Sequence, residues 1–195
     1  MLQIQRKGGG ARTFVPDFAD PLSLLVHCHG RIEAQLAALE RAARAMREGE
    51  GPDGEAARAV WAARAHFAGP GVKHTEDEEV SLFPRLRAHK AALTAEVRGA
   101  LDLLESQHRA ADRVHAELED AADDLDSSRS AGTGAIIRLE AAITELAGLY
   151  RPHILLENEV VYPAAGRILT ADDLLAVGEE MRQRRKDMVA GVAGS

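Results

Sequence analysis

Residues 74–84 read HTEDEEVSLFP, and residues 153–163 read HILLENEVVYP. In both stretches a histidine is followed by a glutamate four residues later and by a proline ten residues later. The residue before each proline is aromatic, Phe83 in the first stretch and Tyr162 in the second. Because the two stretches match at these key positions, they predict a chain made of two related halves. Equivalent residues of the two halves differ in number by a constant amount, which is called the repeat offset below.

The repeat offset extends beyond the two motifs, because it also relates His29 to His108. The spacing from His29 to His74 therefore equals the spacing from His108 to His153. An α-helix rises about 1.5 Å per residue, so in an up-down-up-down bundle these four histidines lie at about one height if the turns fall near residues 51, 90 and 130. We therefore expect them to converge on one site.

The composition favours helices throughout. Alanine, leucine, arginine and glutamate dominate, β-branched residues are sparse, and aromatic residues make up only 4% of the chain. Loops are expected at residues 48–54, near residue 90 and at residues 127–133, and the segment Gly69 to Gly71 is expected to kink or interrupt the second helix. The sequence predicts an all-α protein, an up-down-up-down four-helix bundle with a short C-terminal fifth helix that ends near Lys186.

Three parts are expected along the chain. Residues 1–19, with a glycine triplet and no helical periodicity, form an irregular N-terminal leader. Residues 20–166 form the four-helix bundle that contains both motifs, and residues 167–195 form the short fifth helix and a tail. A chain of 195 residues with 46% hydrophobic residues has enough apolar side chains for the core of one such domain.

Charge and cysteine content exclude several classes of function. With 24 basic and 31 acidic residues the net charge is -7, which argues against nucleic acids and anionic membranes as partners. No stretch approaches the roughly 20 apolar residues of a membrane span, and the N-terminus lacks the apolar core of a secretion signal. The single cysteine, Cys28, is typical of a reducing compartment, so we expect a cytoplasmic protein.

The two His-x3-Glu motifs suggest a metal site. Residues four apart lie one helical turn apart on the same face, so the imidazole and the carboxylate of each motif can reach one ion in the bundle core. Imidazole and carboxylate without thiolate suit iron, manganese or zinc, and two carboxylates can bridge two cations. We expect Glu78 and Glu157 to be the bridges. The remaining expected ligands are His29 and His74 for one cation, and His108 and His153 for the other.

These features together resemble the hemerythrin-like HHE cation-binding family. The resemblance covers about Asp20 to Gly166 and rests on CHGRIE at 28–33, HTEDEEVSLFP, QHRAAD at 107–112 and HILLENEVVYP. It implies a four-helix fold and two iron ions, bridged by an oxo or hydroxo group and by carboxylates. Such a centre is expected to bind or react with a small molecule such as dioxygen, nitric oxide or peroxide.

Two positions depart from the pattern of the oxygen-carrying hemerythrins. Those carriers have His-x3-His on the third helix, whereas here Asp112 follows His108. They also have His-x4-Asp on the fourth helix, whereas here the motif is His-x3-Glu. The repeat offset relates Asp112 to Glu33, so both acids are weaker candidates for orienting or supplementing the ligands.

The missing histidine favours a more open centre that binds or senses a small molecule, rather than an oxygen carrier. The alternatives are an enzyme of peroxide or oxygen chemistry, and a protein that handles iron or repairs iron centres. No residue is assigned a catalytic role. Zinc or manganese in place of iron stays an open alternative, because availability as well as ligand type selects the metal.

Other conspicuous residues have simpler structural interpretations. The acids around the motifs, including Asp77 and Glu79, are expected to form a solvated face, and Trp61 is expected in the core. Tyr150, Phe83 and Tyr162 are expected either to line or plug the site or, as is usual for aromatic residues at helical spacing, to fill the core beside it. The basic run at residues 182–186 is expected to complement the dipole of the fifth helix. The remaining histidines are expected at the surface or at helix ends: His27, His66, His89 and His115.

Overall fold

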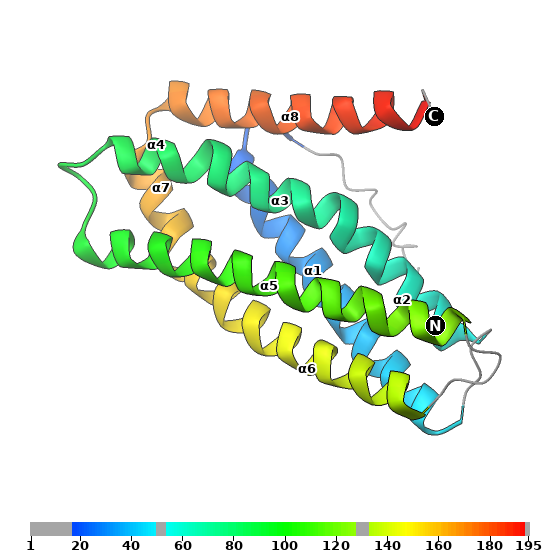
Figure 1. The fold of residues 1–195 in the computed structure, drawn as a ribbon. Helices are drawn as coiled ribbons and strands as arrows, with labels where there is room; N and C mark the ends of the chain where they lie inside the picture. Colours follow the sequence, from blue (N-terminus) through cyan, green and yellow to red (C-terminus); the bar gives the residue numbers. More distant parts are fainter. Residues whose placement is uncertain (1–16, 50–53, 128–132, 194–195) are drawn as a thin grey trace, which may run out of the picture.

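The computed structural model describes residues 17–49, 54–127 and 133–193, and within these ranges the elements are helical and no strand is present. Four long helical rods form a bundle, and a fifth helix lies alongside it (Figure 1). This confirms the predicted all-α bundle. The expected leader at residues 1–19 lies outside the described residues up to position 16. None of the described helices combines the length and the apolar character that a membrane span requires.

The rods follow one another in chain order. The first is α1 (Pro21–Arg47) and the third is α5 (Ala95–Ser127). The second runs without a break through α2 (Glu55–His66), η1 (Phe67–Gly71), α3 (Val72–Glu76), η2 (Asp77–Leu82) and α4 (Phe83–Ala88). The fourth runs through α6 (Thr133–Leu156), η3 (Glu157–Val161) and α7 (Tyr162–Ile168), and α8 (Ala171–Ala193) follows it.

The deviation expected at Gly69 to Gly71 is present but does not break the rod, since α2 ends at His66 and α3 begins at Val72. This segment forms η1, a short π-helical stretch, and the rod continues into α3. A proline has no N–H and its ring crowds the carbonyl of the residue four positions earlier. The wider π-helical turn accommodates Pro70 within a continuous helix, which propensity alone does not reveal.

Both His-x3-Glu motifs contain the same local deviation. In η2 the N–H of Phe83 donates to the carbonyl of Glu78, and in η3 the N–H of Tyr162 donates to the carbonyl of Glu157. Each bond spans five residues instead of four, which defines a π-helical turn. In both motifs a proline is the second residue of the following α-helix, so the wide turn again relieves the crowding that proline causes. The two halves therefore share backbone geometry as well as sequence.

Apolar side chains form two clusters separated along the bundle axis. On α1 the histidine at position 29 lies between Leu25 of one cluster and Ile32 of the other, and on α5 His108 lies between Leu104 and Ala111 in the same way. The bundle thus has a polar layer between two apolar layers. The cluster of Leu25 and Leu104 also contains Leu82, Phe83, Leu101 and Val161, and the cluster of Ile32 and Ala111 also contains Leu36, Leu39, Val114, Leu118, Leu139 and Leu146.

Helix α8 is longer than expected, because it continues to Ala193 instead of ending near Lys186. No proline follows Lys186 to stop it. It packs against η2, α3 and α1 (Figure 1). Two of its basic residues, Arg184 and Arg185, lie 2.8 and 2.6 Å from the carboxylate oxygens of Asp77.

The sequence suggested that Asp77 is a solvated acid, and this expectation is wrong. Its side chain is 0% exposed and forms a buried ion pair with α8. Two other expectations are also wrong. His66 is buried rather than on the surface, and Trp61 is 47% exposed rather than in the core, with the guanidinium of Arg64 4.2 Å from its ring centroid.

Gly178 lies where α8 packs closely against the segment before α1, and a substitution there tests this close packing. A Cβ at this buried position would lie 1.8 Å from the carbonyl oxygen of Phe18, which is backbone and cannot rotate away. We expect Gly178→Ala to lower the free energy of unfolding by about 1–3 kcal/mol, measured by urea denaturation. Gly148→Ala is the control, because nothing lies within 4 Å of its Cβ, and it should stabilise the exposed helix by about 0.5–1 kcal/mol. Equal effects of the two substitutions would contradict the close packing of α8.

Candidate metal centre

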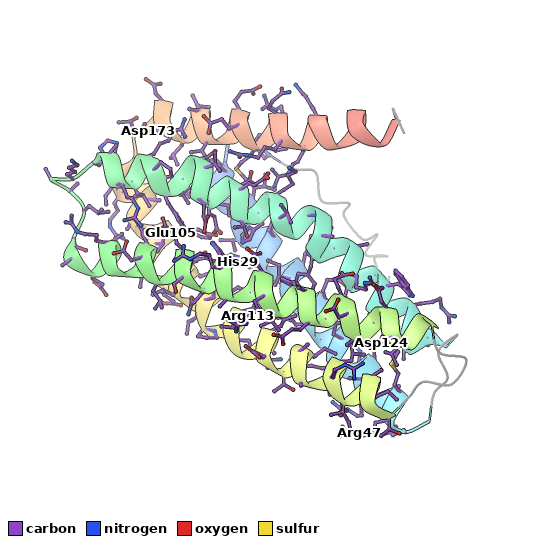
Figure 2. The ribbon with its side chains drawn as sticks, in the orientation of Figure 1. His29, Arg47, Glu105, Arg113, Asp124 and Asp173 are labelled. Atoms are coloured by element: carbon purple, nitrogen blue, oxygen red, sulfur yellow. The ribbon has the colours of Figure 1, made fainter. Side chains whose placement is uncertain are left out.

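Six buried polar side chains meet in the layer between the two apolar clusters. They come from all four rods, and His29 points from α1 into the middle of the bundle (Figure 2). None is more than 5% exposed. They are the six residues expected from the sequence: His29 on α1, His74 on α3, Glu78 in η2, His108 on α5, His153 on α6 and Glu157 in η3.

The six side chains form two overlapping groups of four. One contains His29 and His74, the other contains His108 and His153, and both contain Glu78 and Glu157. Within each group the potential ligand atoms all lie within 4.8 Å of one another. Each group has the number and the types of donor atoms of a metal site. If each group held one cation, the two shared carboxylates would bridge the cations.

Glu157 faces one histidine of each group. Its Oε2 lies 2.9 Å from Nε2 of His29, and its Oε1 lies 3.1 Å from Nε2 of His153. Glu78 is placed similarly, with Oε2 3.4 Å from Nε2 of His108 and 3.7 Å from Nε2 of His74. Each carboxylate therefore reaches both groups at once.

Several of these atoms lack a hydrogen bond of good geometry, although histidine nitrogens lie close to the carboxylate oxygens. Among the described residues, both carboxylate oxygens of Glu157, Oε2 of Glu78 and Nδ1 of His74 are buried without one. Buried charged or polar atoms without a partner cost several kcal/mol, so such atoms are rare in a stable core. Cations between the two groups would satisfy all three of these oxygens. The residues present therefore fit a metal centre.

Three histidines are oriented by bonds on their outer nitrogen. Nδ1 of His29 lies 3.0 Å from Oδ1 of Asn158, that of His108 lies 2.8 Å from Oε1 of Glu79, and that of His153 lies 3.0 Å from Oε1 of Gln107. An N–H on Nδ1 that donates to an oxygen leaves Nε2 directed at the centre. This is the usual orientation of a metal-binding histidine.

Sequence reasoning missed these three outer partners. One signal was available, since the repeat offset relates Glu79 to Asn158 just as it relates the ligands they contact. Glu79 had been assigned to a solvated face. Its side chain is 35% exposed, and its carboxylate contacts His108.

The electrostatics of the site favour an ionised carboxylate at Glu157. Burial raises the pKa of Glu157, but contacts with His153 and His29 outweigh burial and lower it to about 2. Burial lowers the pKa of His74 to about 3, so this imidazole is neutral, as a ligand must be. Burial also lowers the pKa of His108, but Glu78 and Glu79 outweigh it and raise that pKa to about 9.

His108 therefore favours the protonated form, and its Nε2 lies 3.1 Å from Nε2 of His153. A cation held by both nitrogens would take the place of this proton. Metal binding at such a site is accompanied by proton release.

Tyr162 belongs to the site and does more than fill the core. Its hydroxyl donates a short hydrogen bond to Oε1 of Glu78 and lies 3.1 Å from Nε2 of His29. Its ring stacks on that of His29 with centroids 5.4 Å apart. Burial and the charges of Glu157 and Glu78 raise its pKa well above the usual value of a tyrosine, so the hydroxyl keeps its proton.

The two weaker candidates do not reach the centre. Glu33 is exposed on α1, and Asp112 is exposed on α5. Asp112 instead lines a cavity of about 320 Å³ together with His115 and Tyr150, whose hydroxyl lies 2.9 Å from Nε2 of His115. Neither acid is among the ligand atoms that gather in the two groups.

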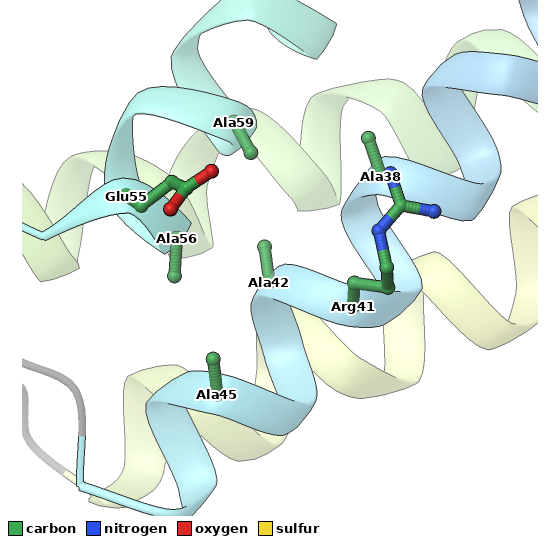
Figure 3. Close-up of a pocket in the computed structure, with 7 residues that line it drawn as sticks. All are labelled: Ala38, Arg41, Ala42, Ala45, Glu55, Ala56 and Ala59. Atoms are coloured by element: carbon green, nitrogen blue, oxygen red, sulfur yellow. The ribbon is translucent and has the colours of Figure 1, made fainter.

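A second cavity lies further along α1, beyond the polar layer. It measures about 260 Å³ and separates α1 from α2, with small side chains on both walls (Figure 3). Its lining contains no histidine, so its donor set does not resemble that of the candidate centre. The residues that line it are Ala38, Arg41, Ala42, Ala45, Glu55, Ala56 and Ala59.

Comparison with known proteins agrees with this geometry. The family described as hemerythrin HHE cation binding domain matches residues 20–166, which is the range of the predicted resemblance and includes all six buried side chains. No curated protein matches the chain at a significant level. Since the match covers three quarters of the chain, this protein belongs to the hemerythrin HHE cation-binding domain family.

Proposed function

We propose that this protein holds two iron ions in the polar layer and binds or senses a small molecule there. Membership of this cation-binding family implies that the protein binds a cation. The step to two cations is supported by one observation above all, namely that both groups of four side chains contain Glu78 and Glu157. One cation would lie among the first group and the other among the second, with the two carboxylates between them.

Iron is favoured by the donor set. Every donor is an imidazole nitrogen or a carboxylate oxygen, and the only cysteine, Cys28, is not among the gathered atoms. Such a set suits iron, and it also accepts zinc or manganese, so the metal in the cell depends on supply as well. When bound, iron would supply a redox-active Lewis acid that interacts with dioxygen or nitric oxide.

Coordination number supports a small-molecule ligand. Each group provides two histidines and two shared carboxylates, and Asp112, the acid at the position of the carriers' extra histidine, lies in a different cavity. Non-haem iron sites with two histidines and few carboxylates leave positions open to exogenous ligands. An open position of this kind favours a binding or sensing protein over the full histidine set of an oxygen carrier.

A second candidate function is the disproportionation of hydrogen peroxide to water and dioxygen. The observation that favours it is the hydroxyl of Tyr162, which touches Glu78 and His29 inside the centre. A phenol that keeps its proton beside reacting atoms can act as a proton donor, and a positioned donor contributes about 10²–10⁴-fold to a rate.

The metal stoichiometry tests the first proposal. Protein from iron-replete cells should contain about two iron ions per chain, measured by elemental analysis. Glu157→Gln keeps the shape of the side chain but removes the charge that faces both groups, so the iron content should fall below about one ion per chain. The matched control is Glu159→Gln, an exposed acid two residues away, which should keep about two. One ion per chain in the unaltered protein would contradict the proposal.

The optical spectrum tests the open position. The reduced, iron-loaded protein should change its visible absorption when dioxygen or nitric oxide is added, because a new ligand alters the ligand field of iron. The same gases with free ferrous iron and with the Glu157→Gln protein serve as controls. A spectrum unaffected by either gas would exclude binding or sensing of these molecules.

Peroxide turnover distinguishes the second candidate from the first. If it holds, the iron-loaded protein releases dioxygen from hydrogen peroxide faster than free iron does. Tyr162→Phe, which keeps the ring on His29 and removes only the hydroxyl, should then lower the rate by about 10-fold or more with unchanged iron content. Turnover no faster than that of free iron would eliminate the candidate.

A further inference from the structure

The two halves place equivalent ligands at equivalent positions, but their outer partners differ in charge. Glu79 and Asn158 are related by the repeat offset, and each contacts Nδ1 of one member of the matching pair His108 and His29. Glu79 contacts His108 at 2.8 Å with a carboxylate, whereas Asn158 contacts His29 at 3.0 Å with a neutral amide. The outer hydrogen-bond partner is thus an anion at His108 and a neutral amide at His29.

A second matching pair differs in polarity. The ring of Phe83 lies nearly parallel to that of His108, at 9° and 6.4 Å, and the ring of Tyr162 lies nearly parallel to that of His29, at 13° and 5.4 Å. Ring packing is therefore preserved between the halves. Only Tyr162 adds a hydroxyl, which donates to Oε1 of the shared Glu78 and lies near Nε2 of His29.

A third difference concerns the histidines of the motifs. Nδ1 of His153 has Gln107 as partner at 3.0 Å, whereas Nδ1 of His74 has none among the described residues. His153 is consequently held in the orientation of a ligand. His74 depends on packing alone for its orientation.

All three differences act in the same direction on cation affinity. A carboxylate on the outer nitrogen makes an imidazole a stronger electron donor than an amide does, and it adds negative charge beside the cation. On the other side, the hydroxyl of Tyr162 competes with a cation for His29, which belongs to one position alone, whereas Glu78 is shared by both. The position between His108 and His153 is thus the stronger one.

We infer that the two cation positions are unequal and fill in order, first the position of His108 and His153, then the position of His29 and His74. The inference rests on the proposed two-cation centre. Outer partners of metal-binding histidines contribute about 10- to 100-fold to affinity. The first dissociation constant should therefore be lower than the second by about that factor.

The experiment titrates Zn²⁺ into the metal-free full-length protein. Calorimetry should resolve two steps, and ¹H–¹⁵N spectra of the histidine rings should show His108 and His153 shifting with the first equivalent, His29 and His74 with the second. The double variant Glu79→Asn with Asn158→Glu exchanges the outer partners without changing the net charge. In this variant the two affinities should move toward each other, because the charge difference between the outer partners is reversed while Tyr162 and Gln107 stay in place.

Glu79→Gln alone provides a milder variant, because it replaces a half-exposed acid by an amide of the same shape. It should weaken the first step by about 10- to 100-fold and so bring the two steps together. The control is Glu76→Gln, which removes a nearby acid that pairs with Lys73 at 2.8 Å and should leave both steps unchanged.

The outcomes separate the two claims. Binding of two zinc ions with one affinity, or two affinities that the exchange of Glu79 and Asn158 does not alter, overturns the inference and leaves the two-cation centre standing. Binding of fewer than two zinc ions overturns the proposed centre and the inference with it.

Discussion

The burial of two carboxylates, Glu78 and Glu157, is the constraint on which the rest of this structure depends. Both are fully enclosed, and a buried negative charge is tolerated only beside compensating charge or hydrogen-bond donors. Compensation comes from four directions, because each rod of the bundle carries one histidine to the same height. Two π-helical turns, each accommodating a following proline, place the carboxylates at this height from the second and fourth rods.

The six residues of the centre could be predicted because their positions follow a simple rule. The repeat offset and the constant rise of a helix determine the height and face of each ligand, and His29 was separated from its neighbour His27 by that rule alone. The helix boundaries were predictable where loops are long and polar. The continuity of the second rod was not, because the π-helical turn at Pro70 depends on backbone adjustment that residue propensities do not describe.

The partners of the ligands were harder to predict for a different reason. Whether the hydroxyl of Tyr162 points at the centre depends on how far η3 rotates the following helix, and the sequence does not specify this rotation. Asp77 was assigned to solvent because three further acids surround it. Its burial depends on α8, an element distant in the chain whose docking no local pattern indicates. Trp61 shows the opposite error, since residue type alone suggested the core.

The position of the polar layer between two apolar clusters has a consequence for how the protein acquires its metal. Each cluster joins the rods on its own side of the layer through contacts that involve no cation. In a zinc finger, by contrast, the chain folds only when the ion is present. Here the packed rods already hold the donor atoms close together, so cation binding does not have to supply the free energy that orders the chain. Cations bound in this layer would therefore add stability to a bundle that the two apolar clusters already hold together.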